Sequence, residues 1–267
     1  MAGRPRVDLE NASIGVGNPA TWPNDVASLV NEVLEDICTW PEVEPGYPSC
    51  DLASHDYELS ADIERRLRVA MNGRSIIAYH ASRLLPHEIV AVQRDGLEVL
   101  SVDLIDRKHA AAREHYPELV SADEVKLLRT TAMHEVRSMG EHISLLWMVA
   151  SFDLFRTQQG ISGFWRLLSR WGGEAIYSTG KATEDELRAM AAIERLSAVS
   201  TPTIIELRIP VAVIPAWREL WPSFVGLVGG YEHPHTEWAV EIGVPADDLL
   251  DVIHPTDDRW PEEQTGL

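Results

Sequence analysis

Apolar residues recur along the chain at two spacings, and each spacing predicts its own kind of element. Steps of three and four residues place side chains on one face of a helix. The ranges with this spacing are 24–38, 61–71, 86–95, about 106–170 and 183–196. Short apolar runs rich in β-branched residues instead predict strands. The runs are 75–79, 99–102, a short segment within 171–179, a segment within 200–210, a segment that begins near Glu237, and 252–253.

Polar and turn-forming residues mark the ends of these elements. Asn24, Ser60 and Thr183 stand at predicted helix starts, where a side-chain oxygen can accept from exposed N–H groups. Gly96 is placed to end the helix over 86–95. The breaks expected within the long helical range are Pro117, Gly140 and Gly160.

Three further ranges complete the predicted pattern. The longest apolar run, 143–155, falls short of the roughly 20 residues of a transmembrane helix and predicts a buried helix. The Trp-rich range 215–228 predicts a loop or a broken helix, and 246–250 predicts one helical turn. Scattered short strands with helices before and between them indicate an α+β fold.

Composition narrows the class of protein. The chain has 267 residues, 45% of them hydrophobic, so it can bury the core of one large domain or of a domain with an appended helical part. Cys38 and Cys50 are its only cysteines, which favours a reducing compartment. The first residues have no apolar core of the kind found in a signal peptide, so we expect a cytoplasmic protein. The formal charge of −19 disfavours bulk nucleic acid and anionic membranes as partners.

A histidine, a tyrosine and a glutamate stand, in that order, at the edges of β-like segments. His80 follows the predicted strand over 75–79, at the point where strand is expected to give way to loop. Tyr177 lies in a short strand entered through two glycines, and Glu237 begins a strand after a proline-broken loop. Polar residues at strand ends are well placed to meet a ligand.

These segments resemble the three signature strands of ADP-ribosyltransferases of the diphtheria-toxin and poly(ADP-ribose) polymerase type. The matching segments are YHAS at 79–82, GGEAIYST at 172–179 and HTEWAVEI at 235–242. A helix after His80 that ends in Gly96-Leu97 adds to the resemblance. Enzymes of this family use a His-Tyr-Glu set to bind NAD and cleave its nicotinamide bond.

The resemblance implies an architecture as well as an activity. It covers about residues 73–254 discontinuously and implies an α+β fold with a split β-sheet core, a large helical insertion and N-terminal helices. Residues 1–72 are then expected to form an arm and helices packed on the core. Residues 73–255 are expected to form the catalytic domain, with the insertion at about 104–170, and residues 256–267 an acidic tail.

The resemblance also implies a role for each residue of the set. Glu237 would hydrogen-bond the 2′-hydroxyl of the nicotinamide ribose and stabilise the oxocarbenium-like centre. Tyr177 would stack on the nicotinamide ring, and His80 would bond a ribose hydroxyl. The NAD-binding set also includes the backbone of Ala81, Ser82, Arg83 near the pyrophosphate, and Ser178 and Thr179 near the nicotinamide amide. All these groups are expected to converge on one dinucleotide-sized hollow.

Two other glutamates compete with Glu237 for the catalytic role. Alternation along the strand puts residues 237, 239 and 241 on one face, so Glu241 is the nearest competitor. The opposite face is apolar and is expected to pack on the core; it carries Trp238, Val240 and Ile242. Glu206 is the next competitor. Glu237 is preferred because it stands at the entry of the strand, where the family has its glutamate.

The sequence departs from the family pattern at two positions. Ala81 stands where relatives commonly have glycine, which bears on the close approach of the nicotinamide amide. His235 stands two residues before Glu237, where arginine-modifying relatives carry Glu or Gln, so it is a candidate base or acceptor-positioning group. The alternative is a plain loop histidine in His233-Pro-His235, and the proline between these histidines argues against a metal site.

The sequence therefore favours an NAD-dependent mono-ADP-ribosyltransferase, a glycosyltransferase of the kind found in bacterial toxins and defence effectors. NAD is its expected substrate, no metal is expected, and the acceptor is left open among protein, nucleic acid and small molecule. Two alternatives remain. One is an NAD glycohydrolase, and the other is a non-catalytic module of the same fold that binds a partner.

Overall fold

The computed structural model describes most of the chain. It covers residues 13–37, 57–139, 145–152, 155, 167–173, 183–215, 217–229 and 237–261. Only the backbone is described at 57, 134–139, 217–219 and 237. Contacts divide the chain into two compact units, each described by itself. Unit 1 comprises Met1–Tyr79, Trp147–Leu154 and Arg208–Ala239, and unit 2 comprises His80–Leu146, Phe155–Leu207 and Val240–Leu267.

The described strands form one open sheet, which with the helices confirms the predicted α+β class. The strands are β1 (Ser13–Gly15), β2 (Ser75–Leu84), β3 (Leu146–Val149), β4 (Thr201–Pro210), β5 (Glu237–Val240) and β6 (Leu249–Ile253). Their order is β5-β3-β2-β4-β6, with β1 parallel beside β2. Antiparallel pairing places Tyr79 opposite Val149 and Ile204 opposite Ile253. The chain crosses from one unit to the other within β2, β3, β4 and β5.

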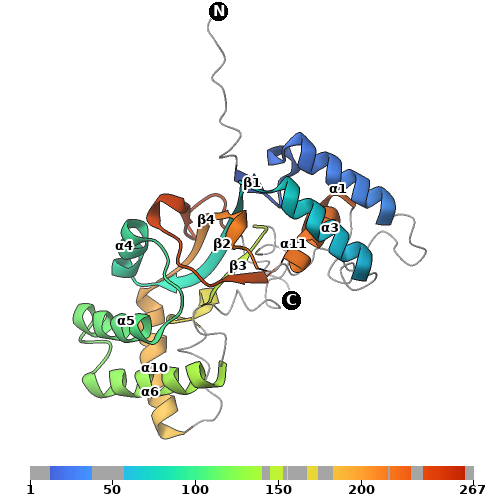
Figure 1. Cartoon of the computed structure of the whole chain (residues 1–267). Coiled ribbons are helices and arrows are strands. Elements are labelled where there is room, and N and C mark those ends of the chain that lie inside the picture. The colour runs from blue at the N-terminus through green and yellow to red at the C-terminus, as the bar shows by residue number, and fades with distance from the viewer. Residues whose placement is uncertain are drawn as a thin grey trace, which may run out of the picture. The chain divides into compact units, whose positions relative to one another are not determined.

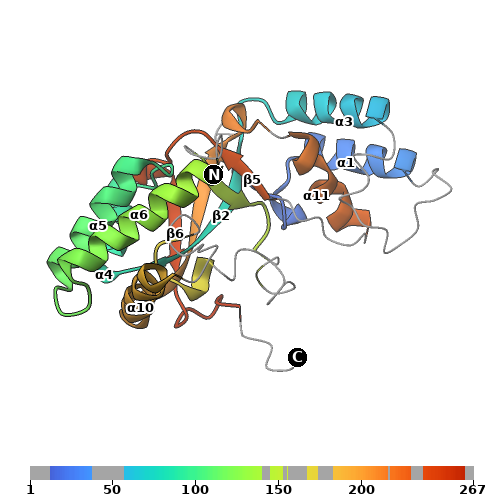
Figure 2. The same ribbon diagram turned by 90° about the horizontal axis from the view of Figure 1, so that it is seen from below.

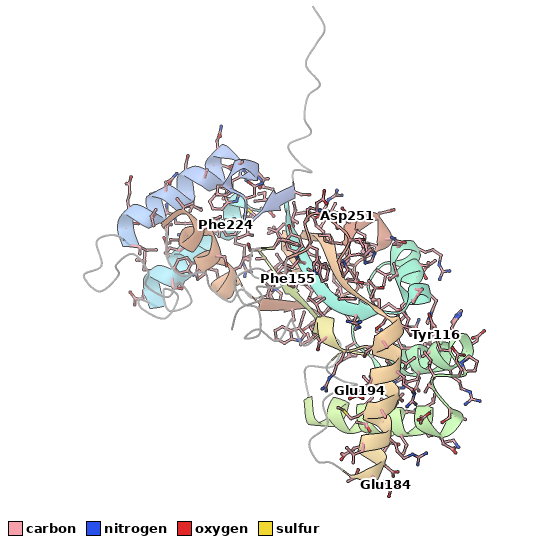
Figure 3. The ribbon with its side chains drawn as sticks, turned by 180° about the vertical axis from the view of Figure 1, so that it is seen from behind. Tyr116, Phe155, Glu184, Glu194, Phe224 and Asp251 are labelled. Carbon is pink, nitrogen blue, oxygen red and sulfur yellow. The ribbon has the colours of Figure 1, made fainter. Side chains whose placement is uncertain are left out.

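In unit 1 the helices α1 (Asn24–Ile37), α3 (Tyr57–Ala70) and α11 (Trp217–Gly229) pack together (Figures 1 and 2). Phe224, labelled in Figure 3, lies among these helices, with its ring 5.1 Å from that of Trp22. Trp221 is fully buried, and its Nε1 donates to Ser60 Oγ at 3.2 Å. Burial of these large aromatic side chains stabilises the packing of the three helices.

In unit 2 the helices α5 (Val102–His115), α6 (Ala122–Met139) and α10 (Glu184–Val199) lie side by side (Figures 1 and 2). We call these helices the helical lobe. Their apolar faces enclose a core to which Leu85 and Trp171 also belong. Helix α4 (Pro86–Asp95) follows β2 directly. Among the described residues, no helix is long and apolar enough to cross a membrane.

Local signals at the helix ends explain where several elements start and stop. Thr183 Oγ1 accepts from Glu186 N at 3.2 Å, and Glu186 Oε2 accepts in return from Thr183 N at 2.8 Å, so α10 begins with a capping box. Gly96 ends α4 with φ at 90°, a conformation that favours glycine. Both ends were predicted from the sequence and are confirmed.

Most predicted elements are present near their predicted positions. The helices over 24–38, 86–95 and 183–196 correspond to α1, α4 and α10, and the strand predicted within 200–210 corresponds to β4 (Thr201–Pro210). The strand predicted to begin at Glu237 is β5, and the predicted turn at 246–250 contains a 3₁₀ turn at Ala246–Asp248. The Trp-rich range is helical, with Pro222 inside α11.

Two predicted elements were wrong. The apolar run 143–155 was expected to be a buried helix, but Leu146–Val149 is a strand, β3, that pairs with β2. A short run with Leu146, Met148 and Val149 all buried fits a helix or a strand equally well, and pairing with β2 decides between them. The strand expected over 99–102 is also absent, because Ser101 Oγ accepts from Leu104 N at 3.1 Å and starts α5 at Val102.

Two further corrections concern single residues. Ser60 does not cap its helix, because α3 begins at Tyr57 and Ser60 is buried within it as the acceptor for Trp221. Ile242 was expected to be buried with Trp238 and Val240, but it is 46% exposed, since β5 ends at Val240.

Candidate functional site

Strand β2 carries the first predicted group of site residues. It runs on to Leu84, so His80 lies inside the strand and not at its end as predicted. His80 and Ser82 are half-buried and occupy alternate positions of one face, while Ala81, on the other face, is 1% exposed. The expectation of an early strand end was wrong because the polar sequence after Tyr79 still pairs within a sheet.

Arg83, the predicted pyrophosphate ligand, has its guanidinium group bound to the protein. Nε donates to Ser197 O at 3.0 Å and Ser200 Oγ at 2.9 Å, Nη1 to Leu168 O at 3.0 Å, and Nη2 to Ser200 O at 3.0 Å. These bonds use three of the five N–H groups of a guanidinium. Burial lowers the pKa of Arg83 from its ordinary value. Arg83 therefore ties β2 to the end of α10, and its role toward NAD stays a prediction.

The second motif is described only at its start. Trp171 is fully buried, and Gly172 and Gly173 follow it with φ of 104° and 72°, as expected of a glycine turn. Trp171 N donates to Ser197 Oγ at 2.9 Å. The predicted ligands Tyr177, Ser178 and Thr179 lie outside the described residues, and so does His235 of the third motif.

Glu237 is the first residue of β5, as predicted, and its backbone alone is described. Trp238 and Val240 are 1% and 0% exposed, which confirms that the apolar face of this strand is buried. The convergence of His80, Tyr177 and Glu237 on one hollow stays a prediction.

The competing glutamates have different surroundings. Glu241 follows the end of β5 and is exposed. Glu206 lies in β4, where its Oε2 is 3.1 Å from Arg259 Nη1. Arg259 also pairs with Asp251 and with Asp257, so one guanidinium links three carboxylates. Glu206 is thus part of an ion-pair network that holds the C-terminal segment against the strands.

A buried polar group that the sequence analysis missed lies beside the second motif. Glu88 of α4 accepts from Leu85 N at 2.8 Å and from Trp171 Nε1 at 2.9 Å, and its Oε1 is 2.8 Å from Lys108 Nζ. Burial opposes ionisation of Glu88, but the attraction of Lys108 and these hydrogen bonds outweigh it and hold its pKa below the usual range. The sequence signal was the glutamate in the first turn after Pro86, a capping-box position.

Two histidines of unit 2, the buried His109 and the half-buried His87, have buried ring nitrogens without a hydrogen-bond partner among the described residues. His109 is 1% exposed, and burial, aided by Lys108, lowers its pKa to about 4. Its ring centroid is 6.1 Å from that of Trp171. His87 is stacked on His115 at 4.2 Å, and burial lowers its pKa. Across the described ranges, no three residues of His, Cys, Asp or Glu gather in a way that suits a metal ion.

Comparison with known proteins adds nothing to this geometry. No protein-family model, no curated protein and no solved structure matches the chain. The resemblance to ADP-ribosyltransferases therefore depends on the three short motifs and on the elements that carry them.

Proposed function

We propose that this protein is an NAD-dependent mono-ADP-ribosyltransferase with a split-sheet catalytic core. The observation that supports the proposal most is that the first and third motifs lie on strands of the sheet. His80 lies in β2 and is followed by α4, which ends at Gly96-Leu97, and Glu237 is the first residue of β5. This is the arrangement of elements that the motif resemblance implies for its first and third strands.

The proposed reaction breaks the bond between nicotinamide and C1′ of its ribose. The bonding electron pair leaves with nicotinamide, and C1′ becomes an oxocarbenium-like centre. The Glu237 carboxylate stabilises this cation and holds the ribose 2′-hydroxyl, while Tyr177 stacks on the leaving ring and His80 holds a ribose hydroxyl. An acceptor nucleophile then bonds to C1′ and gives up its proton. In the hydrolytic alternative this nucleophile is water.

The test is release of free nicotinamide from NAD, measured by chromatography with and without cell lysate. Glu237→Gln keeps the size of the side chain but removes its charge, so we expect at least a ~100-fold fall in the rate. Glu241→Gln serves as the matched control, because it makes the same change beyond the end of β5. Tyr177→Ala is expected to lower the rate as well, since it removes the stacking surface.

Each outcome points to one of the three candidate functions. Release that needs lysate indicates a transferase whose acceptor is in the lysate, and release from the purified protein alone indicates hydrolysis. A parent protein that releases no nicotinamide under either condition contradicts the proposal and favours the binding module. A larger loss in Glu241→Gln or Glu206→Gln than in Glu237→Gln would move the catalytic role to that residue.

A further inference from the structure

We infer that Arg83 is a positioning residue for His80: it holds strand β2 from the face opposite to His80, and it does not bind the pyrophosphate of NAD. This inference deepens the proposed function and rests on it, because His80 is the proposed ligand of a ribose hydroxyl. Both residues lie in the part of β2 that belongs to unit 2, and the groups that Arg83 binds belong to the same unit.

Alternation along β2 puts His80 and Arg83 on opposite faces of the strand. Residues an even number of positions apart share a face, so Ser82 lies on the face of His80. Ala81 lies on the face of Arg83 by the same rule. The faces have different surroundings, since His80 and Ser82 are half-buried whereas Ala81 is 1% exposed. A ligand bound by His80 would therefore lie on the face of β2 away from the Arg83 side chain.

The guanidinium group of Arg83 binds the corner where α10 leads into β4. Its Nε donates to Ser197 O at 3.0 Å and to Ser200 Oγ at 2.9 Å, and its Nη2 donates to Ser200 O at 3.0 Å. Ser200 is the C-cap of α10, and β4 begins at the next residue. The last carbonyl groups of a helix have no partner within the helix and favour a positive charge. Arg83 supplies both the donors and the charge at this corner.

A further bond joins Arg83 to a second segment of unit 2. Its Nη1 donates to Leu168 O at 3.0 Å. The corner itself is held by other bonds, because Ser200 Oγ donates to Ser197 O at 3.1 Å and Trp171 N donates to Ser197 Oγ at 2.9 Å. The N–H groups of a guanidinium point in fixed directions, so bonds to separate segments fix the position of the whole group. The end of β2 therefore has one position relative to this corner.

The position of Arg83 sets that of His80 because one short stretch of strand carries both. Three residues of a β-strand span about 10 Å. Strand β4, which begins at the corner that Arg83 binds, also lies beside β2 in the sheet. A shift of β2 at Arg83 therefore moves His80 as well, and a misplacement of about 1 Å can cost roughly 100-fold in rate.

A double-mutant cycle with Arg83→Lys tests this positioning role. Lysine keeps a positive charge, which is sufficient to bind a phosphate, but it cannot reproduce the planar set of bonds to the carbonyl oxygens. We expect Arg83→Lys to lower kcat/KM for nicotinamide release roughly tenfold, mainly through kcat, because a ribose held out of line still binds but reacts slowly. In a His80→Ala background the same substitution is expected to change kcat/KM less than about twofold, since the group that it positions is gone.

Two results would overturn the inference. The first is a loss from Arg83→Lys that is equally large in the presence and absence of the His80 side chain, because Arg83 would then act without His80. The second is a rise in KM for NAD with kcat unchanged, which is the sign of a residue that only binds the substrate.

Arg195 supplies a matched control within the same unit. Like Arg83, it donates to a backbone carbonyl, with Nε 2.8 Å from Leu119 O, and its Nη2 donates to Glu124 Oε1 at 2.7 Å. These bonds join α10 to α6 and the turn before it, and not to β2. We therefore expect Arg195→Lys to have the same effect on kcat/KM with and without His80. A fall in melting temperature is expected for both lysine variants and does not distinguish them.

A milder pair of variants keeps the inference testable if Arg83→Lys does not fold. Ser200→Ala removes one acceptor of Arg83 Nε, and Ser121→Ala removes a hydroxyl acceptor at the start of α6. We expect Ser200→Ala to lower kcat/KM about threefold, and only when His80 is present. The effect of Ser121→Ala should not depend on His80.

Failure of this inference can be told apart from failure of the proposed function. A parent protein that releases no nicotinamide would overturn both together. An active parent in which Arg83→Lys or Ser200→Ala loses the same factor with and without His80 would overturn the inference alone.

Discussion

Lys108 and Glu88 form an ion pair that is largely removed from water: Nζ lies 2.8 Å from Oε1, with side-chain exposures of 20% and 9%. The same carboxylate accepts from Leu85 N and from Trp171 Nε1, so each of its oxygens has a partner. Buried pairs of this kind contribute little over an apolar pair, but removal of one partner is expensive, because the other charge stays buried.

Lys108→Met tests how much the stability of the protein depends on the Lys108–Glu88 pair. We expect a loss of about 3 kcal/mol in the free energy of unfolding at pH 7, because Glu88 is left buried and ionised without its cation. Lys126→Met is the matched control, since Lys126 pairs with Asp123 at the surface and both side chains are more than 70% exposed. Urea unfolding of the parent and both variants measures the difference, and equal losses would show that burial of the pair has no effect.

Lys108→Met is also expected to reverse the sign of the contribution that Glu88 makes to the pH dependence of stability. In the parent the folded pKa of Glu88 lies below its ordinary value of 4.5, so its contribution is present above pH 4.5 and is lost as pH falls through the folded pKa. Without Lys108, burial dominates and raises the folded pKa. The deficit of Lys108→Met should therefore shrink between pH 7 and pH 4.5, as measured by urea unfolding at both values. If Lys108→Met loses the same free energy of unfolding at both pH values, the loss does not come from a buried, ionised Glu88.

His109 predicts a second pH effect within the helical lobe. Burial holds its folded pKa at about 4 against 6.5 for an ordinary histidine, and the charged groups around it are Glu88, Asp106, Lys108 and Arg129. Below pH 6.5 the unfolded chain binds a proton that the folded chain does not. The free energy of unfolding therefore decreases as the pH is lowered from about 6.5 to about 4. The full effect is about 3 kcal/mol.

Substitution of His109 separates its contribution from those of the carboxylates. His109→Leu is apolar and of similar size, so the variant should lose less stability than the parent between pH 6.5 and 4. Chemical denaturation across this range gives both curves. Parallel curves for parent and variant would mean that His109 takes up its proton in the folded state as readily as in the unfolded state.

Gly96 is predicted to tolerate no side chain. Its φ is +90°, and a Cβ atom there would lie 2.1 Å from Val244 O, because the Leu97 and Val244 backbones exchange two hydrogen bonds of 2.8 Å. Gly73 is the control, with φ of +72° and nothing within 4 Å of the same built atom. We expect about 1 kcal/mol of destabilisation for Gly73→Ala from strain alone, and more than about 3 kcal/mol for Gly96→Ala. Thermal unfolding measures the destabilisation of both variants. Similar losses would show that the Leu97 and Val244 backbones move apart at little cost in free energy.

The elements predicted best from the sequence are those with local signals. Helix α10 has its start encoded by Thr183 and Glu186, three residues apart, and α4 has its end encoded by Gly96. Strand β4 has a long β-branched run. In each case the deciding interactions lie within a few residues of one another along the chain, so periodicity and capping rules are sufficient.

The features that were missed depend on distant residues. Leu146–Val149 forms strand β3 because Val149 pairs with Tyr79, which is 70 positions away in the sequence. His80 likewise lies inside β2 because that strand pairs with strands distant in the sequence. The bond between Trp171 and Glu88 joins positions 83 residues apart. Single-sequence patterns carry no information about such pairs, and the bonds from Arg83 to the Leu168, Ser197 and Ser200 carbonyl oxygens are of the same long-range kind.

Arg259 gives the last prediction, which concerns the C-terminal segment. Its guanidinium pairs with Glu206 of β4, Asp251 of β6 and Asp257. Hydrogen bonds to Asp257 and Asp251 raise its pKa. Arg259→Gln leaves three carboxylates facing one another without a cation. The arginine side chain is 44% exposed, so water screens the pairs and the expected loss is a few degrees in melting temperature.

Salt separates this electrostatic effect from a packing effect. Raising the ionic strength from about 0.01 M to 1 M shortens the screening length from roughly 30 Å to 3 Å, so the difference between the parent and Arg259→Gln should shrink. Arg65→Gln, which alters an exposed pair with Asp62 on α3, is expected to have little effect at either ionic strength. If the Arg259→Gln deficit is the same in low and high salt, Arg259 holds the segment through packing of its aliphatic stem and not through its charge.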